Sequence, residues 1–512
     1  MMLDPRQYSI TNPFDYFQPF QSYLEPSFPR TPEAFFEMEQ QLYQTAAQVG
    51  DHIVLMKIVA AHDDPTFVKH AVEDARTRSP VPLVNKGWKE TSVLFLGGSR
   101  IVLKTPYLRE DHSGKRGRKR TKRGKKGHGV YPVLEALGIR EGVSPATRSE
   151  IALYTVQTGS YHEAKELLDR RGLSCDISTL TRIARSTAHT AIGLREAALD
   201  IAKSLAIPVD GPLGGKRVRI STDGGRVRTR KNHKGRKTTK GRHAFSTPWR
   251  EPRVIVIDVL DDEGKTDALR LPLYDVVIDD ADATFSLIVG YLRLLGAAYA
   301  QQVEFISDGA DWIWERVDRL VSQAEIPQEK LVLVLDFYHA SEHLWEAVCL
   351  CPGLSKKERT KLYKKLRHTL RHESDGAQQV IAALKSRRKR DRGQKMKKSL
   401  AYFEKHLTHM TYVDFDEMNL PVGSGQVESA VRRVVNLRFK APGSFWKEDN
   451  VEQLMHLRAY FKAGRWDELI KGVLTREYDR PTFAPDKQKL RNSLKVIKTP
   501  KTSRQHQQKE AA

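Results

Sequence analysis

The chain has 512 residues, of which 39% are hydrophobic and 29% charged, a composition that supports packed cores and excludes a wholly disordered protein. It has 86 Lys and Arg against 63 Asp and Glu, so the net charge is +23, and this clustered excess predicts a polyanionic partner, with nucleic acid favoured over an anionic membrane surface. The three cysteines exclude a disulfide framework and a four-cysteine zinc site, and they favour a reducing compartment.

Residues 1–110 form the first predicted region. A helical pattern runs from Pro32 to about Ala61, and Ser92–Gly97 with Arg100–Leu108 indicates a short β-hairpin. The first residues lack the apolar segment of a signal peptide, and no run of 18 apolar residues follows anywhere. We therefore expect no membrane partner and a cytoplasmic protein.

A basic, glycine-containing linker is predicted over residues 111–128, and a helical DNA-binding region over 129–205. In that region Ser160 and Glu163 form a capping-box pattern, Gly172 ends the helix, and Ser178 is expected to cap the next one. Two short helices around a glycine turn resemble a helix-turn-helix, which would present Arg182 and Arg185 to DNA. A plain helical bundle is the alternative.

The pattern changes to alternating strands and helices over residues 213–345. Strands are expected at Arg217–Thr222, Arg226–Lys231, Val254–Leu260, Val303–Ile306 and Leu331–Leu335, and helices at Thr284–Ala300, Asp311–Val321 and after Asp336. Within 226–242, nine of seventeen residues are Lys or Arg. Arg226, Arg228 and Arg230 are predicted to contact DNA phosphates.

Carboxylates follow neighbouring predicted strands, where they can converge on one spot. Asp223 and Asp308 each precede a glycine at a strand end, and Glu428 begins a helix after Gly423-Ser424-Gly425. Two or three carboxylates suffice to hold Mg²⁺ or Mn²⁺, and a pair of such ions activates a nucleophile and neutralises a phosphate in phosphoryl transfer. Each carboxylate taken alone is better explained by a turn or a helix cap, so the prediction depends on the three together.

Residues 346–415 are predicted to be a helical, basic insertion, in which 385–398 contains nine Lys or Arg in fourteen residues. The second part of the catalytic core is expected over 416–470, and a basic, disordered tail over 471–512. In the second part, Arg432, Arg438 and Lys440 are further candidates for DNA contact.

Four segments together resemble DDE-type insertion-sequence transposases of the ISKra group, within the Mutator-like set. The resemblance covers about Tyr131 to Trp466. It lies in Ser221-Thr222-Asp223-Gly224-Gly225-Arg226, Ser307-Asp308-Gly309-Ala310-Asp311-Trp312, Leu335-Asp336-Phe337-Tyr338-His339-Ala340 and Gly423-Ser424-Gly425-Gln426-Val427-Glu428-Ser429, with Arg438–Trp446 downstream.

The resemblance implies an α/β RNase H-like catalytic domain with a helical insertion. It implies that Asp223, Asp308 and Glu428 are catalytic and bind two Mg²⁺ or Mn²⁺ ions, and that the protein cuts transposon ends and joins them to target DNA. Asp336 and His339 match a Mutator-like Asp-x-x-His signature, and we expect them to support the site without holding metal. Many relatives carry paired cysteines ahead of the helical region; the hairpin here has none, so no zinc ribbon is expected.

The leading hypothesis is therefore a transposase that acts on double-stranded DNA, both element ends and target, as a homo-oligomer at the nucleoid. One rival is a metal-dependent nuclease of the same fold, which would cut without joining. The other is a non-catalytic, domesticated DNA-binding relative. Basic phosphate-binding stretches would look the same in all three.

Overall fold

The computed structural model describes residues 2–3, 20, 23, 28–111, 129–233, 235, 237, 239, 241, 243–387 and 394–479. The fold is mixed α/β, as predicted. It divides into two compact units, Met1–Pro145 with Glu477–Ala512, and Ala146–Arg476. Residues 112–128 of the expected linker, 388–393 of the basic run and the tail from 480 lie outside the described residues.

The first unit contains a long helix close to its predicted position and a hairpin whose first strand, predicted at Ser92–Gly97, instead runs over Leu83–Leu94. Helix α1 (Pro32–Asp63) starts at Thr31, whose hydroxyl accepts a hydrogen bond from the Ala34 amide at 3.2 Å. Its buried residues, among them Leu55 and Ile58, share a core with the antiparallel pair β2 and β3. The elements are α2 (Pro65–Arg78), β2 (Leu83–Leu94), β3 (Arg100–Glu110), α3 (Pro132–Ala136), β1 (Met2–Leu3) and β4 (Gly129–Val130).

The second unit opens with α4 (Pro145–Gln157), α5 (Tyr161–Arg170) and α6 (Ile177–Ser204). The Ser160 cap is confirmed, and Gly172 adopts the left-handed conformation at φ 79° that ends α5. The expected cap of the next helix is wrong: Asp176 is the cap, and Ser178 donates to its carboxylate at 2.6 Å. Helix α6 also runs for 28 residues, well beyond a short second helix.

A five-stranded sheet forms the centre of this unit, in the order β10-β9-β5-β11-β12. Strands β10, β9 and β5 are antiparallel neighbours, whereas β11 and β12 run parallel to β5. Their bounds are β5 (Arg217–Gly224), β9 (Arg253–Leu260), β10 (Leu273–Val277), β11 (Gln302–Ser307) and β12 (Leu331–Leu335).

Three predicted details of this region are wrong. Strand β6 (Val227–Asn232) leaves the main sheet and pairs with β7 (Phe245–Ser246), β8 (Trp249–Arg250) and β13 (Trp446–Lys447). Its place is taken by β9, and the edge strand β10 was not predicted because Asp275 interrupts its apolar run. The helix expected to reach Ala300 ends earlier, as α7 (Ala281–Leu294), because Gly296 adopts a left-handed conformation before η3 (Ala297–Tyr299).

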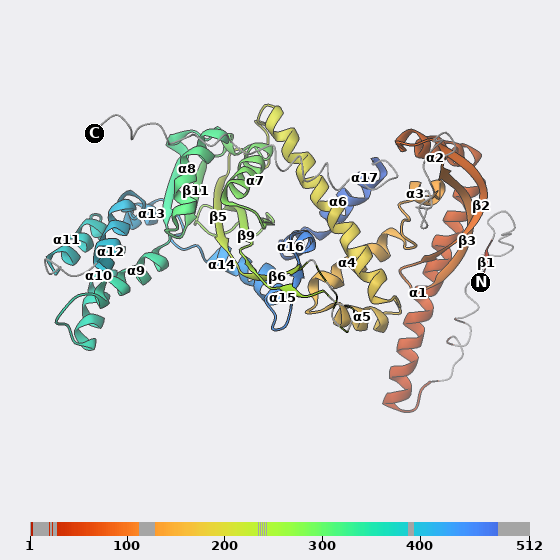
Figure 1. Ribbon diagram of the computed structural model, residues 1–512, viewed down its shortest axis with the longest axis horizontal. Coiled ribbons are helices and arrows are strands. Elements are labelled where there is room, and N and C mark those ends of the chain that lie inside the picture. Colours follow the sequence, from red (N-terminus) through yellow and green to blue (C-terminus); the bar gives the residue numbers. More distant parts are fainter. Residues whose placement is uncertain are drawn as a thin grey trace. The chain divides into compact units, whose positions relative to one another are not determined.

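Helices cover both faces of the sheet, and strand alternation assigns each side chain to one face. On β9, Ile255 and Ile257 share a core with α7 and α8 (Asp311–Gln323), while Val254 and Val256 share one with α6 and α16 (Glu448–Lys462). Figure 1 shows α7 and α8 beside β5 and β11. The predicted carboxylates Asp223 and Asp308 lie at the carboxyl ends of β5 and β11, just before the chain continues into β6 and α8.

The insertion is helical, as predicted, and follows β12. Its helices share a core with β12 and pack around α9, on one side of the sheet in Figure 1. They are α9 (Phe337–Cys349), α10 (Lys356–His372), α11 (Gly376–Ser386), α12 (Gln394–Lys405) and α13 (Tyr412–Glu417), with the short helices η4 (Gln328–Lys330) before β12 and η5 (Leu407–His409) after α12.

The chain then returns to the sheet through α14 (Gly425–Ala430), η6 (Val431–Asn436) and α15 (Leu437–Phe439), followed by α16 (Glu448–Lys462) and α17 (Trp466–Asp479). Segment η6 is a π-helix, a rare form that is frequent at functional sites. In the described part of the chain, no helix combines the length and apolar character needed to cross a membrane.

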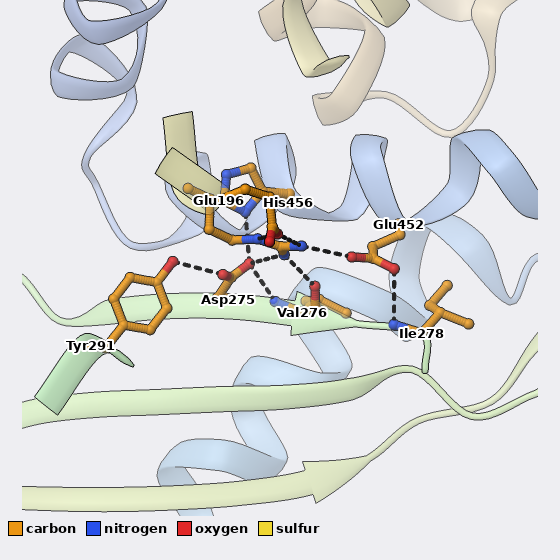
Figure 2. Close-up of polar contacts among 8 residues, drawn as sticks. Glu196, Asp275, Val276, Ile278, Tyr291, Glu452 and His456 are labelled. Atoms are coloured by element: carbon orange, nitrogen blue, oxygen red, sulfur yellow. Dashed lines mark hydrogen bonds and ion pairs between the residues drawn. The ribbon is translucent and has the colours of Figure 1, made fainter. Parts of the chain in front are cut away.

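A buried ionic network fixes α6 and α16 to the edge strand β10 (Figure 2). The carboxylate of Asp275 is fully buried and accepts hydrogen bonds from Tyr291 at 2.7 Å and His456 at 2.6 Å. The Arg195 guanidinium lies 3.5 Å from Asp275 and 2.9 Å from Glu452. Helix α6 is thereby joined to the central sheet by charged groups as well as by apolar packing.

Candidate active site

Asp223 and Asp308 lie at the same level on two adjacent parallel strands. Ser221 of β5 is in register with Ile306 of β11, so the residues two positions further along each strand are Asp223 and Asp308. The Ser307 hydroxyl donates to the Thr222 carbonyl at 3.1 Å, which fixes the strand ends against each other. The predicted convergence of these two carboxylates is therefore present in the structure.

The backbone around each aspartate is held by hydrogen bonds. The Gly224 amide donates to Asp223 Oδ1 at 2.6 Å, and the Ala310 amide donates to Asp308 Oδ1 at 3.1 Å. The Trp314 indole donates to the Asp308 carbonyl at 2.6 Å. Each of these two amide hydrogen bonds engages the Oδ1 oxygen of the aspartate and fixes the direction in which the carboxylate points.

Glu428 comes from α14, more than 100 residues along the chain from the two aspartates. Its carboxylate lies 3.5 Å from the His339 imidazole, and Glu428, Asp308 and His339 all lie near enough for their charges to influence Asp223. The pKa of Asp223 is raised to about 6, chiefly by burial and also by the charges of Asp308 and Glu428, against a hydrogen bond from Gly224 and the charge of His339.

Asp336 and His339 connect the loop before α14 to the same edge of the sheet. Strand β12 lies beside β11, as predicted, and the Asp336 carboxylate accepts hydrogen bonds from the Tyr338 amide at 2.6 Å and the His339 amide at 3.0 Å. It also accepts one from the Ser424 amide at 2.5 Å. Asp336 thus caps α9 and anchors the loop that carries Glu428.

The His339 imidazole reaches Glu428 directly. Its Nε2 lies 3.5 Å from Glu428 Oε1, and its Nδ1 lies 3.7 Å from Glu342 on the same helix. The ring is 35% exposed, which leaves it accessible from the solvent side of the site. Asp336 therefore orients the backbone of His339, while His339 orients the side chain of Glu428.

One residue of the site could not be identified from the sequence. Tyr402 of α12 lies against Gly309 so closely that a side chain at that glycine would meet the Tyr402 ring at 2.2 Å. Burial, with Asp308 and Asp336 nearby, raises the pKa of the Tyr402 phenol. Nearly a hundred positions separate Tyr402 from Asp308, and no motif marks it, so only the fold of the insertion reveals it.

The chemistry of the three carboxylates fits a hard divalent cation. Asp, Asp and Glu oxygens are the ligands that Mg²⁺ prefers, and the like charges gathered here are what such a cation would neutralise. Among the described residues, no three His, Cys, Asp or Glu side chains stand close enough to form a ready-made metal site. A bound ion would therefore require these side chains to rearrange.

The predicted DNA-contacting residues differ in exposure. Arg182, Arg226, Arg228, Arg432 and Lys440 are exposed, and Arg185 and Arg230 are half-buried. Arg228 and Arg230 lie over the rings of Trp249 and Phe245, at 4.7 and 4.1 Å. Aromatic stacking of this kind orients a guanidinium while leaving its edge free for a phosphate.

Arg438 does not fit its predicted role. It is only 3% exposed, its Nη1 donates to the Gly159 carbonyl at 2.6 Å, and its guanidinium lies 4.8 Å from the Trp446 ring centroid. Burial lowers the pKa of this group. The side chain is part of the packing between α15 and the start of α5, so we remove it from the DNA-contacting set.

The comparisons with known proteins add no family to these observations. No protein-family model matches the chain, and no curated protein matches it.

The raised pKa of Asp223 predicts that this residue destabilises the folded protein in the absence of metal. Its usual value of 3.8 applies to the unfolded chain, so above pH 6 the folded state holds an unfavourable charge. Asp223→Asn should increase the free energy of unfolding at pH 7.5 by up to about 3 kcal/mol, at about 1.4 kcal/mol per pKa unit, and the gain should shrink as the pH falls from 6 to 4.

Urea unfolding in EDTA measures this effect. Asp311→Asn is the matched control, because Lys405 lowers the pKa of that carboxylate and its removal should bring no gain. If Asp223→Asn were no more stable than the wild-type protein at any pH, the charge of Asp223 would not destabilise the folded state.

Proposed function

We propose that the protein is a DNA transposase that cuts the ends of its insertion sequence and joins them to target DNA by metal-dependent phosphoryl transfer. One observation carries the proposal: Asp223 and Asp308 follow each other in register on two adjacent parallel strands, β5 and β11, and His339, beside the neighbouring strand β12, contacts Glu428 of α14 at 3.5 Å. The strand order supports an RNase H-like catalytic domain, and a site at the carboxyl ends of parallel strands is where such chemistry is expected.

Asp223, Asp308 and Glu428 would hold the Mg²⁺ or Mn²⁺ ions, with two ions expected. When bound, the ions would lower the charge of the scissile phosphate and the pKa of the attacking oxygen. The protein's own groups then have defined tasks. The two aspartates are fixed by the Gly224 and Ala310 amides, and Glu428 is held by His339 and by the loop tied to Asp336.

Both reaction steps suit a single site. Water attacks the phosphodiester at the element end, and the released 3′-hydroxyl then attacks the target phosphodiester in line. Because both are phosphoryl transfers with similar development of charge, the same carboxylates can serve both. The exposed arginines at 226, 228 and 432 would hold phosphates beside the site. The reaction would occur on nucleoid DNA, with more than one copy bound to pair the two ends.

Joining distinguishes this proposal from the nuclease alternative. Purified protein is incubated with Mg²⁺, a labelled duplex from the DNA that flanks the coding region, and an unrelated plasmid. The proposal predicts labelled 3′ ends covalently joined to the plasmid. Cleavage without joining would support the nuclease, and DNA binding without either would support a non-catalytic relative.

His339 should contribute moderately, because it acts through Glu428 rather than on the metal ions. We expect His339→Ala to lower cleavage and joining by roughly 10–100-fold, the usual loss for a group that orients a ligand, with an unchanged Mg²⁺ requirement. His339→Gln keeps a donor near Glu428 and should recover part of the rate. Unchanged rates for a folded His339→Ala protein would leave the histidine only a packing role.

A further inference from the structure

Helix α10 of the insertion carries an unusual concentration of positive charge. Between Lys356 and His372 it has eight Lys or Arg and a single acidic residue, Glu358. In the part of the chain that the structure describes, Arg371 alone among these eight forms an ion pair, with Asp416. Most of this charge is therefore uncompensated, and it lies within the predicted basic insertion but outside its most basic run, residues 385–398.

The charge is gathered around a hollow of about 460 Å³. The residues that line it recur along one face of α10 at helical spacing, and they are Tyr363, Lys364, Arg367, His368, Arg371 and His372. The opposite face holds Leu366 and Leu370, which are buried in the core of the insertion. The helix is thus fixed by its apolar face and presents the hollow outward.

Two guanidiniums in the hollow are held in place. Arg367 lies 4.8 Å from the centroid of the Phe337 ring, and Arg371 lies 5.7 Å from the same ring. Arg371 also donates to Asp416 through both terminal nitrogens, one of them at 2.6 Å. Side chains fixed in this way lose less freedom when they bind an anion than mobile lysines do, which distinguishes the hollow from a merely solvated basic surface.

The hollow is connected to the candidate active site through one residue. Phe337, on which both arginines stack, directly follows Asp336, and its amide donates to the Val422 carbonyl of the loop before Glu428 at 2.8 Å. The residue that supports both arginines is thus bonded to the loop that leads to Glu428, and Lys364 and Arg367 in the hollow form no ion pair among the described residues.

We propose that this hollow on α10 binds backbone phosphates of the DNA strand that passes through the active site. The inference rests on the proposed function and extends it, because it makes the insertion a DNA-holding element. The ligand is a phosphodiester, supplied either by the element end or by the target.

The test measures the salt dependence of DNA binding by the full-length protein. Fluorescence anisotropy with a labelled end duplex and with an unrelated duplex, from 50 to 200 mM salt, gives two slopes of log affinity against log salt. Lys364→Gln with Arg367→Gln should reduce the slope by roughly 2, at about 0.9 for each phosphate that the protein no longer neutralises. Lys364→Glu alone is the second variant, since this exposed lysine can change without disturbing the packing on Phe337.

Lys265→Gln is the matched control. This lysine is exposed and pairs with Glu263. It follows Leu260 at the end of β9, whereas Asp223 is paired with Val254 near the start of that strand. If the hollow variants show a reduced slope on the end duplex, the hollow binds element DNA. If they show it on the unrelated duplex, the hollow binds target DNA. Wild-type slopes for both hollow variants on both duplexes would overturn the inference. If the hollow variants show reduced slopes but the wild-type protein does not cleave DNA, the inference about the hollow stands and only the proposed function is overturned.

Discussion

Replacing Asp308 by Asn is expected to lower DNA strand cleavage by orders of magnitude while DNA binding persists. The substitution keeps the shape of the side chain and an oxygen that can accept from the Ala310 amide, but it removes the negative charge that would hold a divalent ion. Asp223→Asn and Glu428→Gln should have the same effect. Cleavage is measured in Mg²⁺ under single-turnover conditions, and binding by anisotropy in Ca²⁺ or EDTA.

Asp311→Asn is the control for this prediction. Asp311 lies three residues beyond Asp308, is exposed and forms an ion pair with Lys405, so its loss should leave cleavage nearly unchanged. Near-wild-type cleavage by Asp308→Asn would mean that the metal site has been assigned to the wrong carboxylates.

Loss of the Asp275 charge should have the largest effect on stability. Burial alone would raise the pKa of Asp275, but His456 and Arg195, with hydrogen bonds from His456 and Tyr291, hold it well below its usual value. In Asp275→Asn the buried guanidinium of Arg195 would lose a compensating charge (Figure 2). Breaking a buried ion pair in this way costs about 3–5 kcal/mol, measured by urea unfolding at pH 7.

Asp282→Asn provides the comparison. Asp282 also has two arginine partners, Arg316 at 2.9 Å and Arg319 at 2.6 Å, but its side chain is 48% exposed. Surface pairs of this kind contribute about 0–1 kcal/mol. If the two variants lost similar stability, the network between α6, β10 and α16 would not be the structural tie that its burial suggests.

The strands that carry the site could be predicted from the sequence because each has a clear local signal. Leu331–Leu335 is an apolar run that ends at a carboxylate, and Arg217–Thr222 ends at Asp223-Gly224. Parallel neighbours place such ends at one edge, so the meeting of Asp223 with Asp308 followed from strand order alone. The capping box at Ser160 was equally local and was confirmed.

The details that failed depend on contacts distant in sequence. Arg438 is in a basic stretch, but its burial comes from Gly159 and Trp446. Strand β10 was missed because its central Asp275 is neutralised by residues of α6, α7 and α16 that no local pattern indicates. Tyr402 and the α10 hollow depend in the same way on how the insertion folds back toward β12.

The most direct test of the account is a count of Mn²⁺ ions bound by the protein on uncleaved end DNA. Electron paramagnetic resonance reports free Mn²⁺, so a titration gives the number of ions bound to wild-type protein and to Asp308→Asn. The account predicts up to two additional ions on the wild-type complex, with binding that weakens as the pH falls below about 6, where Asp223 takes up a proton. Equal Mn²⁺ binding by wild-type protein and Asp308→Asn would contradict a metal-dependent active site at this edge of the sheet.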